Sequence, residues 1–313
     1  MTSSANGRPV GPVGFVGLGR MGSAMAANLA GGGQRVIGYV RHADQADKLS
    51  ALGLEATTDI ADLFGCEVVI SMLPDDDVVR DVVLGHSDSG GLARGLKPGA
   101  LHLGMSTIST AMASQLATEH ATLGQGYVSA PVFGNPQAAR ERQLFIVAAG
   151  ADLARCQPLF DAMGQKTFVV DGEPWRANLV KLLGNMMSAT ALEMISEAVA
   201  LLLKRGLDPK SFIEIMTDTM FGGRAHRIYG DKIVNQSYAA GFVLPLVLKD
   251  VRLALAEGEL AGAPMPSVDV VRDRLITGIS RGYDDLDWTA LGLIAAEEAG
   301  LSPGRAPAHR PAP

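Results

Sequence analysis

A narrow polar stripe within an apolar stretch is the part of this sequence that could carry proton chemistry. Asn178, Lys181, Asn185 and Ser188 are spaced by three, four and three residues among leucines, valines and methionines. In a helix this spacing aligns the side chains on one face. A lysine on a helix is usually a solvated surface charge, but an ammonium buried among apolar groups is costly unless it has partners or a purpose. We therefore predict Lys181 as a proton donor and acceptor, with Asn185 orienting a substrate.

The stripe lies on a segment that predicts one long helix, from Pro174 to Arg205. Proline suits a first helical turn, and Gly206 is the next glycine that could end the helix. At about 1.5 Å per residue such a helix spans about 45 Å, enough to form the backbone of a domain. Because apolar residues between positions 178 and 188 go all the way round, we expect this part to be buried on every side.

The composition describes a compact protein of two domains. The chain has 313 residues, of which 47% are hydrophobic and 19% charged, and its net charge of −6 favours neither nucleic acid nor an anionic membrane as a partner. Two cysteines, Cys66 and Cys156, suggest neither a disulfide framework nor a metal site. The N-terminus lacks an apolar signal segment, so we expect a cytoplasmic protein without a membrane span. Residues 1–9 and 303–313 are expected to be disordered tails.

A glycine turn near the N-terminus predicts a dinucleotide site. It follows a short apolar run that ends at Val16 and precedes a helix of small residues from Ser23 to Ala30. Strand, glycine turn and helix is the context that makes a GxGxxG motif informative. Gly17 permits the tight turn, Gly19 lets a pyrophosphate approach the backbone, and Gly22 lets helix and strand pack closely. The predicted cofactor contacts here are Gly17, Leu18, Gly19, Arg20 and Met21.

The end of the next expected strand, Arg35 to Val40, indicates which cofactor is bound. An NAD site would have Asp or Glu here to hold the ribose hydroxyls. The sequence instead has Arg41, and no carboxylate follows before Asp44. An arginine can pair with a 2′-phosphate, so we predict NADP(H) rather than NAD. The alternative is that Arg41 is only a surface charge.

Further strand-like runs alternate with helical spacers up to residue 172. They lie at residues 67–72, 100–105, 127–130, 144–148 and 167–170, which predicts an α/β fold with a doubly wound Rossmann sheet over residues 10–172. Leu73-Pro74 and Ser106-Thr107 each follow one of these strands, at the carboxyl edge where ligands bind, so we predict that they contact the cofactor. Ser106 could also cap a helix.

The rest of the chain predicts an all-helical domain, residues 173–302, built on the long helix and serving substrate binding and oligomerisation. Besides the long helix, helical segments are expected at residues 208–217, 246–260, 267–281 and 287–300. Lys249 lies in the apolar run VLPLVLKDVRLALA and repeats the feature that singles out Lys181. It is either a second functional lysine or a surface charge paired with a neighbour such as Asp250.

With these residues assembled, the sequence resembles the β-hydroxyacid dehydrogenase family, which includes 3-hydroxyisobutyrate dehydrogenases and glyoxylate and succinic semialdehyde reductases. Four segments carry the resemblance over about residues 12–300: GFVGLGRMG, SAPVFGN, GEPWRANLVKLLGN and GFVLPLVLKD. The resemblance implies that Lys181 is the catalytic acid and base, that Asn185 binds substrate, and that Lys249 reaches the cofactor or substrate. It also implies that the end of the segment from Ser129 to Asn135 holds a substrate carboxylate, and that the chain forms dimers or tetramers through its helical domain.

The SAPVFGN segment departs from the family pattern, which resembles DAPVSGG. Phe133 stands in place of the serine, while Ser129 and Asn135 replace the aspartate and the second glycine. Phe133 removes a hydroxyl that would bind a carboxylate and adds apolar bulk, although the Gly134 N–H and the Asn135 amide could still serve. The substrate would then be larger or less polar than a hydroxy acid of three or four carbons. Alternatively, Phe133 points into the core and the pocket is ordinary.

The mechanism that follows is hydride transfer from NADPH to a small carbonyl compound, a semialdehyde or a keto or aldehyde acid, with no metal. Lys181 would give a proton to the oxygen that becomes the alcohol, and desolvation would bring the lysine pKa from about 10.4 towards the working pH. One alternative is imine reduction on the same scaffold; imine reductases resemble this fold but usually lack the lysine, while Phe133, Met186 and Met216 keep this alternative open. The other is a non-catalytic NADP-binding protein, which loss of the lysine or of the glycine turn would favour, but both are present.

Overall fold

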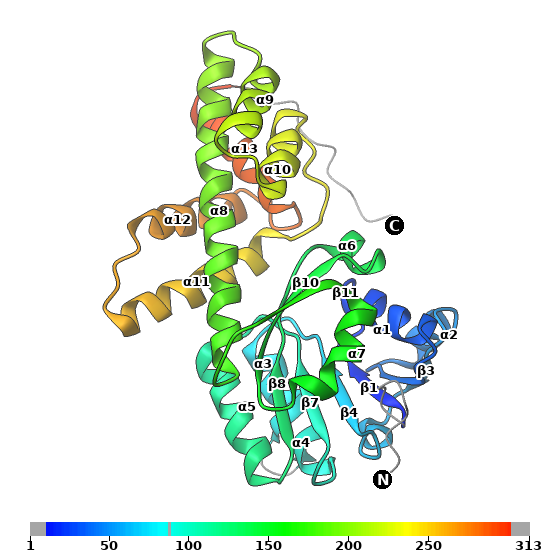
Figure 1. The fold of residues 1–313 in the computed structure, drawn as a ribbon. Helices are drawn as coiled ribbons and strands as arrows, with labels where there is room; N and C mark the ends of the chain where they lie inside the picture. Colours follow the sequence, from blue (N-terminus) through cyan, green and yellow to red (C-terminus); the bar gives the residue numbers. More distant parts are fainter. Residues whose placement is uncertain (1–10, 87–88, 302–313) are drawn as a thin grey trace. The chain divides into compact units, whose positions relative to one another are not determined.

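The structure is a computed structural model that describes residues 11–86 and 89–301. The chain divides into two compact units between Lys181 and Leu182, and each unit is described by itself. The first holds a sheet with its helices, and the second is helical (Figure 1). The predicted tails, residues 1–9 and 303–313, lie outside the described residues, and so do positions 10 and 302 at the outer edges of the two expected domains. The domain boundary expected after residue 172 stays a prediction.

The described part of the first unit contains a sheet of nine strands. Eight follow the order β11-β10-β8-β7-β4-β1-β2-β3, and β9 pairs with β10. Within this sheet, neighbouring strands are parallel along β3-β2-β1-β4-β7-β8. Strand β10 is antiparallel to β8, and β11 is parallel to β10. This mixed, mostly parallel sheet confirms the predicted Rossmann-type fold. The bounds are β1 Val13–Val16, β2 Val36–Tyr39, β3 Glu55–Thr57, β4 Val68–Ser71, β7 Leu101–Gly104, β8 Gly126–Ser129, β9 Val132–Phe133, β10 Leu144–Gly150 and β11 Gly164–Val169, with a separate hairpin of β5 Gly85–His86 and β6 Ser89–Gly90.

The helices of the first unit begin at polar side chains that accept hydrogen bonds from the first turn. Asp75 accepts from the Val78 N–H, and Asn135 accepts from the Ala138 N–H, each at 2.9 Å. Such caps satisfy N–H groups that have no partner within the helix. The bounds are α1 Gly22–Gly31, α2 Ala46–Ser50, α3 Asp76–Val79, α4 Leu92–Gly95, α5 Thr110–Thr122, α6 Pro136–Arg140 and α7 Leu153–Met163, with single turns at Ala43–Gln45, Ile60–Leu63 and Arg80–Leu84.

The long helix α8, Trp175–Lys204, has ends within one residue of the predicted ones, and the second unit is built on the part of it that follows Lys181. Its helices pack around a core that includes Leu192, Leu244, Leu275 and Leu291. The all-helical character of this unit is confirmed. The remaining bounds are α9 Pro209–Thr219, α10 Arg224–Val234, α11 Leu244–Ala261, α12 Pro266–Ser280 and α13 Leu291–Glu298, with a single turn at Trp288–Ala290 (Figure 1).

One side of α8 is exposed, so the expectation of burial on every side is wrong for the single chain. Four apolar residues seven positions apart, Val180, Met187, Met194 and Leu201, are 40%, 66%, 50% and 64% exposed. A spacing of seven places them along one line of the helix, the spacing of a helix-to-helix seam. We call this line the α8 stripe.

By length and composition, α8 is also the one helix of the described residues that could cross a membrane. A single helix of this kind is weak evidence, because the core helix of a soluble protein passes the same test. The sequence expectation of no membrane span stays a prediction.

Candidate functional site

The glycine turn after β1 contains two glycines that the fold itself requires. Gly17 has φ of +90°, and a Cβ there would lie 2.2 Å from the Met72 carbonyl oxygen. A Cβ on Gly22 would lie 2.0 Å from the Gly17 carbonyl oxygen. A Cβ on Gly19, by contrast, would meet no atom within 4 Å. The chain thus keeps open space at Gly19, beside the start of α1, where a pyrophosphate would approach the backbone.

The strand register brings the other predicted cofactor residues to the same edge of the sheet. Val16 is in register with Tyr39 and with Ser71, and Ser71 with Gly104. The segments that follow these residues therefore all leave the sheet at its carboxyl edge, where ligands of such folds bind. Of the predicted contacts, Gly19, Arg20, Arg41 and Pro74 are exposed, Gly17, Leu18, Met21, Leu73 and Thr107 are half-buried, and Ser106 is buried. These residues fit a dinucleotide.

Ser106 joins two of the edge segments rather than capping a helix. Its Oγ accepts a hydrogen bond of 2.7 Å from the Leu73 N–H. The cap of α5 is Ser109, whose Oγ accepts from the Met112 N–H at 2.9 Å. The suggestion that Ser106 also caps a helix is therefore wrong, because a closer serine does so.

Lys181 lies at the start of α8 and is only 7% exposed. Its Nζ lies over the Phe133 ring, 4.4 Å from the ring centre. An aromatic face attracts an ammonium by about 0.5–2 kcal/mol, depending on how far the pair is removed from water. Phe133 is half-buried at the end of β9 and packs on a cluster of Val147, Ala149 and Ala177. It therefore contributes to a core and lies under the lysine at the same time.

Ser129 and Asn178 form a buried pair beside these residues. The Ser129 hydroxyl, fully buried at the end of β8, donates a short hydrogen bond to Asn178 Oδ1 on α8. Asn178 is 1% exposed, and its Nδ2 has no partner among the described residues. Ser129 was predicted to contact substrate, and in the structure its hydroxyl holds the first turn of α8. Of the other residues in this segment, Gly134 and Asn135 are exposed. The side-chain oxygen of Asn135, Oδ1, caps α6.

Asn185 is oriented by a carboxylate that the sequence interpretation did not include in the site. Its Nδ2 donates to Asp250 Oδ2 at 2.6 Å, and Lys249 Nζ lies 2.9 Å from Asp250 Oδ1. Asp250 is 2% exposed, and the Lys249 side chain is 22% exposed. Because an ionised carboxylate only accepts, it fixes which end of the Asn185 amide faces it. A carboxylate in an apolar helical run was the available signal for Asp250. The ion pair suggested as an alternative for Lys249 is present, but on a largely buried side chain.

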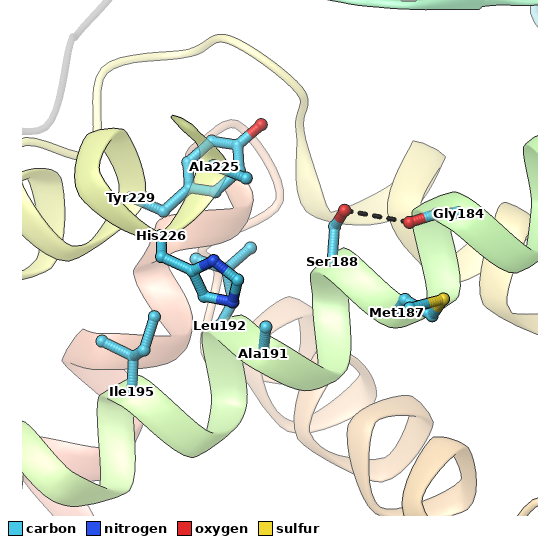
Figure 2. Close-up of a pocket in the computed structure, with 9 residues that line it drawn as sticks. All are labelled: Gly184, Met187, Ser188, Ala191, Leu192, Ile195, Ala225, His226 and Tyr229. Carbon is cyan, nitrogen blue, oxygen red and sulfur yellow. Dashed lines mark hydrogen bonds between the residues drawn. The ribbon is translucent and has the colours of Figure 1, made fainter. Parts of the chain in front are cut away.

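A cavity of about 310 Å³ opens between α8 and α10 (Figure 2). The His226 ring projects from α10 towards α8, and Tyr229 of α10 also lines the cavity. The Ser188 hydroxyl donates to the Gly184 carbonyl oxygen at 2.9 Å. Neither α10 residue had been predicted, since no pattern in the sequence pairs them with the stripe. The cavity is lined by Gly184, Met187, Ser188, Ala191, Leu192, Ile195, Ala225, His226 and Tyr229, so its walls are mainly apolar.

The described residues contain no group of three or more His, Cys, Asp or Glu side chains that could hold a metal ion. Both cysteines are buried free thiols, and burial raises the pKa of Cys66 to about 11 and that of Cys156 to about 12. A thiol with so high a pKa is a poor nucleophile at neutral pH. The chemistry of the site therefore falls to the lysines and amides.

Comparison with known families matches both parts of the chain. Residues 12–172 match the NAD binding domain of 6-phosphogluconate dehydrogenase, and residues 176–303 match the family described as NAD-binding of NADP-dependent 3-hydroxyisobutyrate dehydrogenase. Solved imine reductases share the fold only: the enzyme from Pseudomonas sp. is 20% identical, with a TM-score of 0.59 over 92% of this chain and 99% of that one.

Three individual relatives match this chain over nearly the whole of their own length. The oxidoreductase YfjR of Bacillus subtilis is 36% identical over 89% of this chain and 98% of its own. Glyoxylate/succinic semialdehyde reductase 1 of Arabidopsis thaliana is 32% identical over 89% and 96%. The 3-hydroxyisobutyrate dehydrogenase of Mycobacterium tuberculosis, solved with L-serine, has a TM-score of 0.80 at 26% identity over 90% and 98%. With its glycine turn and the helix that carries Lys181 both in place, the chain belongs to the β-hydroxyacid dehydrogenase family of NAD(P)-dependent oxidoreductases, the family that includes 3-hydroxyisobutyrate dehydrogenases.

Proposed function

We propose that the protein is an NADPH-dependent reductase that interconverts a small carbonyl compound and the corresponding hydroxy compound, with Lys181 as general acid and base. The observation that carries this proposal is the nearly buried ammonium of Lys181, held over an aromatic ring in a member of a dehydrogenase family. The bound cofactor supplies the hydride. The protein supplies the proton, the orientation of the substrate and a site from which most water is excluded.

Lys181 Nζ donates a proton to the carbonyl oxygen as negative charge develops there, and solvent later restores the proton to the amine. An ammonium both stabilises and neutralises this oxygen, which is worth about 10²- to 10⁴-fold in rate. In the oxidation direction the neutral amine accepts the alcohol proton. Asn185, held by Asp250, is one helical turn away on the same helix and orients the substrate.

Replacement of Lys181 tests the proposal. Lys181→Met keeps the length of the side chain without its charge and is expected to lower kcat by about 10²- to 10⁴-fold, with the dissociation constant for NADPH nearly unchanged. Lys204→Met is the matched control, because Lys204 is exposed at the other end of α8. A Lys181→Met enzyme with the turnover of the wild type would refute the proposal.

The substrate proposed here carries an apolar group beyond its carbonyl. Phe133 supplies apolar area under Lys181. The second unit has a mainly apolar cavity of its own, which Ser188 of α8 helps to line. Succinic semialdehyde and glyoxylate, which appear in the name of a relative, are the small reference substrates.

Imine reduction is a second candidate, supported by the apolar cavity and by the fold shared with imine reductases. A panel of succinic semialdehyde, glyoxylate, longer alkyl and aryl aldehydes, and a cyclic imine separates the two functions by NADPH consumption. Ala191→Phe would fill the cavity and lower kcat/KM for the longer aldehydes about tenfold more than for glyoxylate. Ala261→Phe, at an exposed position ending α11, is the control. No consumption with any compound would favour a non-catalytic NADP-binding protein.

The α8 stripe supports the proposal that the chain forms a homodimer or tetramer through its helical unit. Four exposed apolar residues at heptad spacing would each lose contact with water against a second helix.

A further inference from the structure

A chain of buried hydrogen bonds crosses the first unit and has no part in the proposed chemistry. Ser71 Oγ lies 2.8 Å from His102 Nε2, His102 Nδ1 lies 2.8 Å from His120 Nε2, and His120 Nδ1 lies 2.6 Å from Gln125 Oε1. Ser71 ends β4, His102 is on β7 and His120 is on α5. All four side chains are at most 8% exposed. We call this set the histidine chain.

The direction of every bond in the histidine chain follows from its last member. Gln125 Nε2 donates to the carbonyl oxygens of Ala93 and Leu96, each at 2.8 Å, so its Oε1 is the atom that faces His120 and it can only accept. His120 must therefore carry its proton on Nδ1.

The same reasoning continues to the serine. Burial lowers the pKa of both histidines, and the neighbouring His120 lowers that of His102 further, so both rings are neutral near pH 7. A neutral His120 with Nδ1–H accepts at Nε2, and His102 must then donate from Nδ1 and accept at Nε2. The hydroxyl of Ser71 is left as the donor to His102. Four side chains thus form one directional path without a conflict.

The serine end of this path lies against the nucleotide edge of the sheet. Ser71 is the last residue of β4, and its carbonyl oxygen accepts from the Met105 N–H at 2.8 Å. The carbonyl of the next residue, Met72, is the group that excludes any side chain at Gly17. Two residues beyond Ser71, the Leu73 N–H donates to Ser106. A lateral shift of the end of β4 would therefore move the wall of the glycine turn and the link between two predicted cofactor segments together.

We propose that Ser71, His102, His120 and Gln125 are positioning residues for cofactor binding. They fix the end of β4 relative to β7 and α5, and they act through Leu73 and Ser106 without touching the cofactor. The path connects segments that are far apart in the sequence, since Gln125 and Ser71 are 54 residues apart. It ends at Ser71, at the sheet edge where the cofactor phosphates and ribose are expected. The inference rests on the proposed function only in requiring that the protein binds NADPH.

Substitution of the serine tests the inference without a large change in volume. Ser71→Ala removes the donor and leaves His102 Nε2 without its partner, and we expect the dissociation constant for NADPH, measured by nucleotide fluorescence, to rise about tenfold. At saturating NADPH, kcat should stay within about threefold of the wild type, because the residue touches neither substrate nor Lys181. Ser71→Thr keeps the hydroxyl and should restore binding to within about threefold.

A matched control separates positioning from loss of stability. Ser196 is a buried serine of the second unit whose hydroxyl donates to the Leu192 carbonyl oxygen at 2.7 Å, and Ser196→Ala should leave NADPH binding unchanged. Binding of NADPH by Ser71→Ala within about twofold of the wild type overturns the inference, as does an equal loss in Ser196→Ala.

The direction of the bonds is tested on the unmodified protein. Nitrogen-15 NMR of labelled histidines should show His102 and His120 both neutral with the proton on Nδ1, and an Nε2–H tautomer in either ring would overturn the inference even if Ser71→Ala failed to fold. A wild-type protein that binds neither NADPH nor NADH would instead refute the proposed function, so the two failures are distinguishable.

Discussion

Two single substitutions in the glycine turn after β1 distinguish a glycine that the fold requires from a glycine that a ligand requires. A Cβ at Gly19 meets no atom within 4 Å, so Gly19→Ala should fold with the stability of the wild type. The same methyl group would occupy the open space expected for the pyrophosphate. Gly17→Ala places a Cβ 2.2 Å from the Met72 carbonyl oxygen at a φ of +90°, so it should destabilise the protein even without a ligand.

The expected sizes can be worked out from ligand linkage. NADPH at 100 times its dissociation constant stabilises the wild type by about 2.7 kcal/mol, or about 5–10 °C in Tm for a protein of this size. If the methyl group at position 19 weakens binding tenfold, the same concentration supplies only about 1.4 kcal/mol, or about 3–6 °C. Gly17→Ala should lose at least about 2 kcal/mol, or about 4–8 °C, before any NADPH is added.

The assay is thermal unfolding with and without NADPH, together with direct titration of NADPH fluorescence. Gly19→Ala should match the wild type in Tm without ligand and fall short of it with ligand. If Gly19→Ala binds NADPH as tightly as the wild type, the space at Gly19 is not the phosphate site. If Gly17→Ala unfolds at the wild-type temperature, the close contact with Met72 is not a constraint on the fold.

Three further expectations follow from other parts of the molecule. Arg41→Ala should raise the dissociation constant for NADPH about tenfold and leave that for NADH unchanged in titration, because only NADPH has the 2′-phosphate; equal losses would refute the cofactor assignment. Since the pKa values of His102 and His120 are lowered in the folded state, the unfolded chain binds protons first as the pH falls below about 6.5, and urea unfolding should show stability decreasing by up to about 1.4 kcal/mol per pH unit for each ring. A His120→Gln variant with the same acid slope would contradict this. Met194→Glu, in the middle of the α8 stripe, should reduce the mass measured by light scattering, whereas an unchanged mass would exclude the stripe as an interface.

The fold could be predicted where a pattern is local and long. The bounds of α8 follow from a proline, an apolar run and a glycine within one stretch, and the observed ends differ by one residue. Two strands of the nine-stranded sheet had no such signal. β3, Glu55–Thr57, is a short edge strand without a run of apolar residues, and β9, Val132–Phe133, has only two residues. Their pairing with longer neighbours makes them strands, and that pairing is not encoded in their own composition.

The site could be predicted in its residues better than in its contacts. The buried lysine was identified because an ammonium among leucines has an energetic cost wherever it lies. The bond from Ser129 to Asn178 joins residues 49 positions apart, and that from Asn185 to Asp250 joins residues 65 apart. Local spacing carries no information about such pairs. The same limit explains why Ser106 was suggested as a helix cap, since the sequence offers two serines and only the backbone decides that Ser109 does so.

The uninterrupted course of α8 restricts how this chain can change in length. Each residue of a helix turns the chain by about 100°, so deletion of one residue between Lys181 and Asn185 would rotate every later side chain away from its present direction. Insertion of seven residues would change the direction by only about 20° but would move Asn185 about 10 Å further from the lysine. Neither change leaves both the direction and the distance as they are. Descendants of this sequence should therefore vary in length in the loops between helices, and keep four positions from lysine to asparagine.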